Sequence, residues 1–186
     1  MNPIADAPVP DDLSQSWQVI HGYSISIRPL RRTDLDIESA FVHGLSQQTR
    51  HNRLLGGVIN ISRAYIERLT TIDYRREMAL AAAVMTVDSE VLIGVARYVM
   101  DADPAGEPAP CEFAIVVADA WQGRGIGKHL MPKLIAVARS RGIPRMYGEI
   151  LSTNHGMQTL VRKLGFRLER HPQDATVIRA TLELAR

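Results

Sequence analysis

Three glycines at alternate positions within Gln122–Gly127 constrain the fold more than any other segment, because they join an apolar stretch to a helical one. Glycine lets the backbone turn tightly with no side chain in the way. Consecutive N–H groups at the start of a helix can then point at one anion. Arg124 and Lys128 add positive charge at the same place. The segment predicts a strand, a turn and a helix that bind a pyrophosphate; the alternative is a glycine-rich turn without a ligand.

Two common phosphate loops do not match this spacing. A Walker A loop needs glycine, four residues, then Gly-Lys-Ser/Thr. Here Gly127-Lys128 is followed by His129, and the position of the earlier glycine is occupied by Gln122. In the dinucleotide fingerprint, Gly-x-Gly-x-x-Gly, the third glycine would come one residue later. The pyrophosphate therefore belongs to another class of ligand.

The composition excludes several other classes of function. The 186 residues include 22 basic and 20 acidic side chains, a balance that does not favour nucleic-acid or membrane binding. Cys111 is the only cysteine, so a disulfide framework is impossible and a reducing compartment is expected. The N-terminus lacks the pattern of a signal peptide, and we expect a cytoplasmic protein. No two histidines have metal-ligand spacing, and we expect no metal site.

The hydrophobic pattern predicts a tail at residues 1–20 and a single mixed α/β domain at residues 21–186. Helices are expected after Thr33, after Ser62, after the glycine loop and after Asn154, each of the named polar residues being an N-cap. A polar segment, Ser46–Asn52, separates the first two. Strands are expected at Ser24–Arg28, Met78–Thr86, Val91–Met100, Glu112–Ala118, Arg145–Leu151, Phe166–Arg170 and Thr176–Leu184.

The glycine segment resembles the Gln/Arg-x-x-Gly-x-Gly/Ala signature of the GNAT acyltransferases, whose loop binds the pyrophosphate of coenzyme A. More narrowly, the chain is similar to the acetyltransferase domain of bacterial Pat-type protein lysine acetyltransferases. The segments that carry this second resemblance are Leu45–Arg53, Ile72–Leu80, Glu112–Val117 with the following Trp121–Gly125, and Leu164–Phe166. The resemblance implies a GNAT-type α/β fold, with a mixed central sheet of about seven strands flanked by about four helices.

The resemblance also implies the site residues. Glu112 matches the Pat-type catalytic glutamate; a water-facing glutamate at the strand edge is the alternative. Strand alternation puts Glu112 on one face with Ala114 and Val116, where apolar walls would raise the pKa of its carboxyl. In this fold the strand is bulged and splayed from its neighbour, which frees backbone groups around Val116 and Val117. The expected coenzyme-binding residues are Val116, Val117, Gln122, Gly123, Arg124, Gly125, Ile126, Gly127, Lys128 and Asn154.

The implied activity is acetyl-CoA-dependent acetyl transfer to an amine, a protein lysine Nε-amine above all, such as one on an acyl-CoA synthetase. Two alternatives stay open: acetylation of a small amine or antibiotic, and a non-catalytic acyl-CoA sensor. Many GNAT enzymes place a tyrosine general acid where this chain has Val161; the Pat-type domains lack it too. Leu45–Arg53 and Ile72–Leu80 are expected on the acceptor side. The partners expected are acetyl-CoA and the amine acceptor, with a monomer or homodimer.

Overall fold

The computed structural model describes residues 15–19, 23–57, 60–102 and 109–184. Within them, eight strands form a single sheet in the order β1-β2-β3-β4-β5-β6-β8-β7. The strands are β1 (Gln15–Val19), β2 (Tyr23–Pro29), β3 (Glu77–Met85), β4 (Glu90–Met100), β5 (Cys111–Val117), β6 (Arg145–Leu151), β7 (Arg167–Arg170) and β8 (Val177–Glu183). The α-helices are α1 (Leu35–Gly44), α2 (Gln47–Arg53), α3 (Arg63–Thr70), α4 (Ile126–Ser140) and α5 (His155–Lys163).

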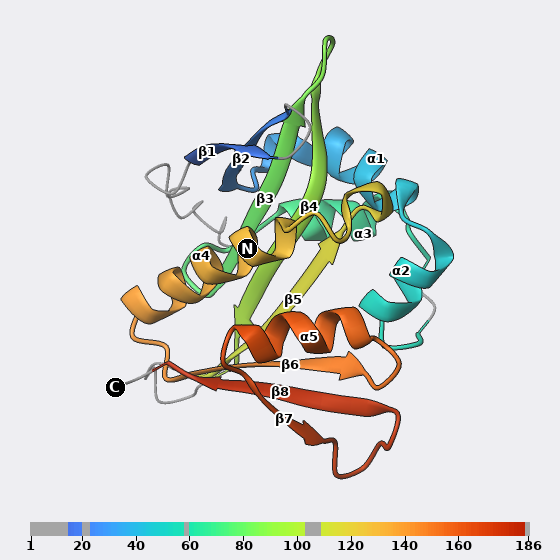
Figure 1. Ribbon diagram of the computed structural model, residues 1–186. Helices are drawn as coiled ribbons and strands as arrows, with labels where there is room; N and C mark the ends of the chain where they lie inside the picture. The colour runs from blue at the N-terminus through green and yellow to red at the C-terminus, as the bar shows by residue number, and fades with distance from the viewer. Residues whose placement is uncertain (1–14, 20–22, 58–59, 103–108, 185–186) are drawn as a thin grey trace.

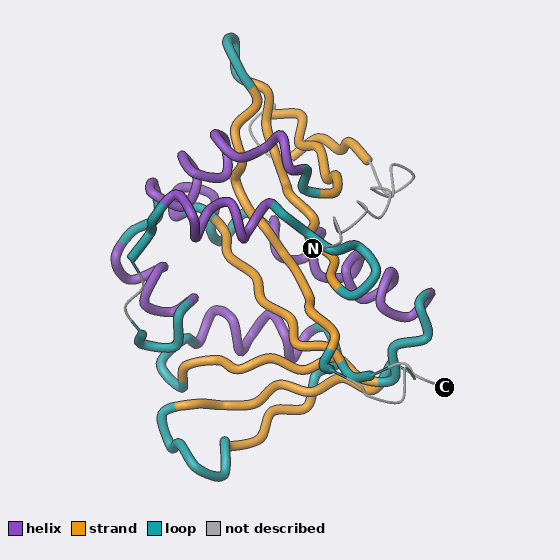
Figure 2. Tube along the Cα trace, turned by 180° about the vertical axis from the view of Figure 1, so that it is seen from behind, coloured by secondary structure: helices purple, strands orange, loops and turns teal. Residues whose placement is uncertain are grey.

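The helices cover both faces of the sheet (Figures 1 and 2). One core packs α4 and α5 against the strands, with Leu130 and Val161 fully buried in it. The other packs α1 and α3 against the opposite face, around Phe41 and Ile66. Strand β3 shows how one sequence serves both cores, because successive residues along Ala79–Val84 alternate between them.

Two elements differ from the sequence expectation. Strand β1 pairs with β2 along Gln15–Val19, inside the segment expected to be a tail, while residues 1–14 lie outside the described residues. Helix α2 occupies the segment that was expected only to be polar. Its N-cap is Ser46, whose hydroxyl accepts a hydrogen bond from the Thr49 N–H (3.1 Å). Hydrophobic periodicity could not predict α2, because this helix has no apolar face.

The sheet opens between β5 and β6, the one pair of neighbouring strands in it that is parallel. Their pairing is limited to Cys111 with Met146 and Glu112 with Tyr147; beyond these residues the two strands diverge, as Figure 1 shows. Strand β4, by contrast, follows β5 along its whole length from Cys111 to Val117. The divergence leaves one edge of β5 without a neighbouring strand and positions the site.

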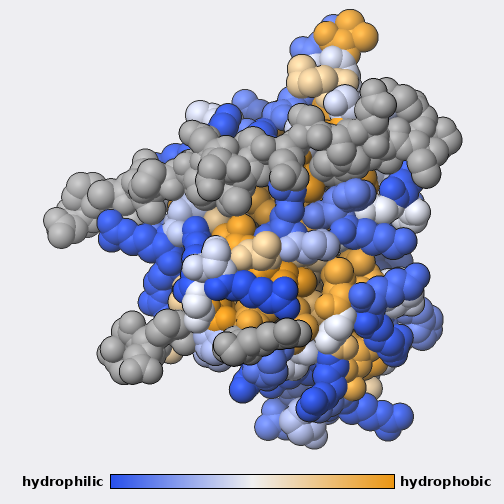
Figure 3. Space-filling model, turned by 60° about the vertical axis from the view of Figure 1, so that its left-hand side comes forward, coloured by the Kyte–Doolittle hydropathy of each residue, from blue (hydrophilic) through white to orange (hydrophobic). Residues whose placement is uncertain are grey.

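The hairpin between β3 and β4 projects beyond the rest of the molecule and has hydrophobic residues at its tip (Figure 3). The exposed fractions are 69% for Met85 and 102% for Val87. A turn closed by the Thr86 N–H, which donates to the Ser89 carbonyl (2.8 Å), confirms the hairpin that the sequence predicted.

Candidate active site

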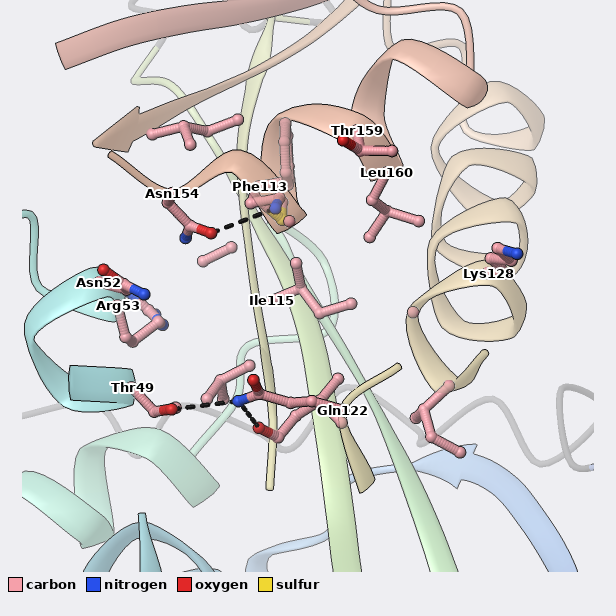
Figure 4. A pocket seen from close by; sticks show the side chains of 18 of the residues that line it. Thr49, Asn52, Arg53, Phe113, Ile115, Gln122, Lys128, Asn154, Thr159 and Leu160 are labelled. Carbon is pink, nitrogen blue, oxygen red and sulfur yellow. Dashed lines mark hydrogen bonds between the residues drawn. The ribbon is translucent and has the colours of Figure 1, made fainter. Parts of the chain in front are cut away.

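A cleft of about 400 Å³ lies where β5 and β6 separate. Its walls come from α2, β5, the glycine loop, the first turn of α4, the end of β6 and α5 (Figure 4). Ten of the eleven site residues predicted from the sequence line it: Glu112, Val116, Val117, Gln122, Gly123, Gly125, Ile126, Gly127, Lys128 and Asn154. One cleft therefore collects almost the whole predicted site.

The glycine loop has the backbone that its sequence predicted. Gly123 and Gly125 have φ angles of 73° and 89°, a region that favours glycine, and a Cβ at either would meet nothing within 4 Å. The Gln122 N–H donates to the Asp119 carbonyl (3.2 Å), and the Lys128 N–H to the Gly125 carbonyl (2.9 Å). Between these bonds lie the first N–H groups of α4, which have no acceptor inside the helix. The loop can therefore bind an anion with N–H groups and the positive end of the helix dipole.

The predicted side chains around the loop have different roles. Lys128 is exposed at the edge of the cleft, in position to neutralise a phosphate. Arg124 does not line the cleft; its guanidinium lies over the ring of Trp121, 5.3 Å from the centroid, so only its backbone belongs to the loop. Asn154 is the N-cap of α5, where its Oδ1 accepts a hydrogen bond from the Met157 N–H (3.1 Å).

Strand β5 offers backbone groups to the cleft. The Ala118 N–H donates to the Ile93 carbonyl of the preceding strand (2.9 Å). Bonded and non-bonded pairs alternate in an antiparallel ladder, so Val116 also bonds to β4, while Val117 directs its N–H toward the gap. The Val117 carbonyl accepts a hydrogen bond from the Gln122 Nε2 (3.1 Å). Both residues line the cleft, and coenzyme binding by either one stays a prediction. The bulge was misplaced: the register shift lies in the pairing of β3 with β4, at Ile93, and β5 itself pairs regularly.

Glu112 lies on the face of β5 that the alternation predicted, with Ala114 and Val116. Its surroundings differ from the apolar walls expected, because the residue is exposed and charged neighbours face it. Partial burial raises the pKa of its carboxyl, the nearby Glu149 carboxylate raises it further, and the Arg53 guanidinium opposes both. A carboxylate with a raised pKa is a better proton acceptor at neutral pH than an ordinary glutamate.

Helix α5 turns one face to the cleft, and that face was missed in the sequence. Thr159, Leu160 and Lys163 line the cleft, and their spacing of three and four residues would have placed them beside Gly156. Val161, at the position where many GNAT enzymes carry tyrosine, is fully buried in the core instead. A proton donor on this helix would therefore have to come from another position.

Helix α2 forms the wall opposite α5 (Figure 4). Thr49, Asn52 and Arg53 line the cleft, and so does Leu55 directly after the helix. Leu55 has a φ of 50°, the left-handed region that a leucine seldom adopts. The segment Leu45–Arg53 therefore contributes to the cleft, and its role on the acceptor side stays a prediction.

The second segment, Ile72–Leu80, does not line the cleft, and its expected acceptor role is not supported. Its side chains serve the fold: the Tyr74 hydroxyl donates to the Leu30 carbonyl, and Glu77 forms an ion pair with Arg68 (3.0 Å). The resemblance in this segment reflects how β3 begins.

Neither a metal-binding cluster nor a membrane-spanning helix occurs in the described part of the chain. No three histidine, cysteine, aspartate or glutamate side chains there come together as a metal would require. No described helix has the length and hydrophobicity needed to cross a bilayer.

Comparison with known proteins gives consistent matches. The sequence model of the Acetyltransferase (GNAT) family matches residues 59–166. The chain is 38% identical over 157 residues to Acetyltransferase PA5475 of Pseudomonas aeruginosa. This match covers 84% of the chain and 82% of that protein. The chain is also 31% identical over 149 residues to Acetyltransferase Pat of Mycolicibacterium smegmatis. This match covers 80% of the chain but only 43% of that longer protein. Among solved structures, the GNAT domain of S. lividans PAT superposes with a TM-score of 0.81 at 26% identity, over 95% of this chain and 100% of that domain.

Proposed function

Since the chain belongs to the GNAT acetyltransferase family and is an acetyl-CoA-dependent N-acetyltransferase, we propose that its acceptor is a lysine side chain of another folded protein. In this proposal the glycine loop binds the pyrophosphate of acetyl-CoA, the free edge of β5 binds the pantetheine arm, and Glu112 is the general base. A cytoplasmic location and a monomeric or homodimeric state complete the proposal.

The observation that carries the choice of acceptor is the exposure of Glu112. A base that serves small amines is expected in a closed acidic pocket, whereas a lysine on a protein surface must reach its base from solvent. Glu112 is exposed and lines the cleft, and so does Arg53 of α2, the segment that resembles Pat-type domains. Arg53 and Arg179 also offset the acidic groups around Glu112, which disfavours a pocket built for polycations.

The proposed chemistry requires three events at the cleft. Glu112 accepts a proton from the lysine ammonium through water, since it lies five residues from Val117 along β5, about 16 Å in an extended strand. The ordinary ammonium pKa of about 10.4 leaves few neutral amines near pH 7, so a base is needed. The amine nitrogen then forms a bond to the carbonyl carbon, and the Val117 N–H, directed into the gap, can donate to the carbonyl oxygen as charge develops on it. The carbon–sulfur bond breaks, and the thiolate leaves without a tyrosine acid because a thiol pKa of about 8.5 makes it a tolerable leaving group. The second proton, which the nitrogen loses as it becomes an amide, passes to the departing thiolate or to solvent.

The proposal is tested by offering both kinds of acceptor to the enzyme. Acetyl-CoA with a labelled acetyl group is incubated with folded proteins, including an acyl-CoA synthetase, and separately with polyamines and aminoglycosides. We expect mass spectrometry to find acetyl groups on protein lysines, and Glu112→Gln to remove them. Efficient turnover of the free amines with no modified protein lysine would favour the small-molecule alternative. Coenzyme binding without any transfer would favour a sensor.

A further inference from the structure

The carboxylate of Asp119 connects the coenzyme side of the cleft to α2. It accepts three hydrogen bonds from residues about 70 positions earlier in the chain: from the Ser46 N–H (2.9 Å), the Ser46 hydroxyl (2.6 Å) and the Thr49 hydroxyl (2.7 Å). Asp119 begins the short 3-10 helix Asp119–Trp121, which leads directly into the glycine loop. The start of α2 is therefore hydrogen-bonded to the segment that directly precedes the glycine loop.

Gln122 adds a second connection. Its Nε2 donates both to the Thr49 hydroxyl (3.1 Å) and to the Val117 carbonyl (3.1 Å), as the dashed lines in Figure 4 show. The Thr49 hydroxyl therefore donates to Asp119 and accepts from Gln122 at the same time. One buried hydroxyl links α2, the end of β5 and the first residue of the glycine loop.

Helix α2 depends on these links for its place. It has seven residues, too few for a stable isolated helix. Thr49 is the one residue buried within Gln47–Arg53, so the helix buries no apolar side chain of its own, although Leu45 is buried just before it. Arg53, one turn after Thr49, and Leu55 face the cleft beside Glu112. Loosening the Thr49 contacts would move the side chains that a substrate amine must pass.

We propose that Thr49 and Asp119 are positioning residues that transmit coenzyme binding at the glycine loop to α2, so that the acceptor wall becomes ordered once the coenzyme is bound. Coenzyme at the loop immobilises Asp119 and Gln122, and these two residues hold Thr49. The acceptor then loses less conformational entropy on binding, because part of the ordering has already occurred. The consequence for the acceptor rests on the proposed function, whereas the ordering of α2 rests only on the part of it in which acetyl-CoA binds at the glycine loop.

The test compares Thr49→Val, which keeps the shape and removes the hydroxyl, with Thr49→Ser, which keeps the hydroxyl. Amide hydrogen exchange of residues 50–55 is measured with and without acetyl-CoA. We expect acetyl-CoA to slow this exchange in the wild type and in Thr49→Ser, and the effect to be at least fivefold smaller in Thr49→Val. The Kd of acetyl-CoA should change by less than about threefold, while the acceptor kcat/KM falls by roughly tenfold through a higher acceptor KM.

The proposal would be overturned if acetyl-CoA slowed the exchange equally in Thr49→Val and Thr49→Ser. It would also be overturned if a variant in which acetyl-CoA no longer slows the exchange kept the wild-type acceptor KM. Asp119→Asn supplies a second measurement at an exposed position, and it should also lose most of the slowing. If no protein is acetylated by the wild type, the function proposed above fails, yet the exchange data still decide the coupling. If proteins are acetylated but acetyl-CoA does not change the amide exchange of α2, only the proposed coupling between the coenzyme and α2 fails.

Discussion

The two sides of the cleft are built in different ways. The side that we propose for the coenzyme is mainly backbone: the N–H groups of the loop at residues 122–127 and the edge of β5 that faces the gap, all within a short stretch of sequence. The acceptor side is mainly side chains, and Arg53, Glu112 and Glu149 reach it from α2, β5 and β6. A site that binds through backbone N–H groups needs glycines, which leave those groups accessible. A site that binds through side chains needs elements that are distant in the sequence to be placed correctly by the fold. Substitutions should therefore affect coenzyme binding on one side and turnover on the other.

The largest effect is expected from Gly125→Asp. The substitution puts a carboxylate and a Cβ at the proposed anion site, and it strains a backbone with a φ of 89°. We expect acetyl-CoA affinity, measured by calorimetry, to fall by roughly a hundredfold or more, because the new charge repels the pyrophosphate.

Gly142→Asp is the matched control. Gly142 has a φ of 70°, equally open space around a Cβ, and a place after α4 away from the cleft. It should carry a similar backbone strain and leave the affinity unchanged. Equal losses in the two variants would assign the effect to strain, and full affinity in a folded Gly125→Asp would show that the loop does not bind the coenzyme.

The second effect separates turnover from coenzyme binding. Glu112→Gln keeps the shape of the side chain and removes its basicity, so turnover should fall by roughly a hundredfold. Calorimetry should give an unchanged acetyl-CoA affinity, since the carboxylate is on the acceptor side. A variant that turns over normally, with the wild-type pH–rate profile, would remove Glu112 from the mechanism.

This difference between the two sides also decided what could be predicted from the sequence. The strands, α4 and α5 were expected close to their observed bounds because their apolar periodicity is strong, and the glycine loop was identified because its residues are consecutive. Helix α2 was missed because it is polar throughout and is fixed by Asp119, about 70 residues away. Strand β1 was missed because a segment rich in proline and polar residues resembles a tail until β2 pairs with it.

Within the site, contacts that cross the sheet could not be predicted. Glu149 lies near Glu112 only because β6 pairs with β5 in parallel at Tyr147 and then turns away. The orientation of the Val116 and Val117 backbones required the register of β4 and β5. Thr159 and Lys163, by contrast, share a helix face with Gly156, and the spacing alone was sufficient to group them.

A smaller effect is expected at Leu55, whose left-handed backbone costs about 1 kcal/mol for a residue with a branched side chain. Asparagine tolerates this conformation, so Leu55→Asn should keep or slightly raise the free energy of unfolding in urea while raising the acceptor KM several-fold. Leu54→Asn, at a neighbouring position with a φ of −103°, should only destabilise. Equal destabilisation by both substitutions would mean that Leu55 stores no strain.

The smallest effect tests the electrostatics around the base. The Glu149 carboxylate raises the pKa of Glu112, and it also accepts a hydrogen bond from Arg179 (2.9 Å) and lies 3.5 Å from the His171 Nε2. A general base is active when deprotonated, so kcat/KM rises with pH through the pKa of Glu112. Glu149→Gln removes a negative charge and releases the Arg179 guanidinium, and both changes lower that pKa. The acid limb of kcat/KM should therefore move to lower pH, by roughly half a unit.

Glu183→Gln, which removes a carboxylate paired with Arg145 outside the cleft, should leave the limb in place. A limb that stays fixed in Glu149→Gln would mean that Glu112 is not the group that titrates, and the acceptor side would then need a different base.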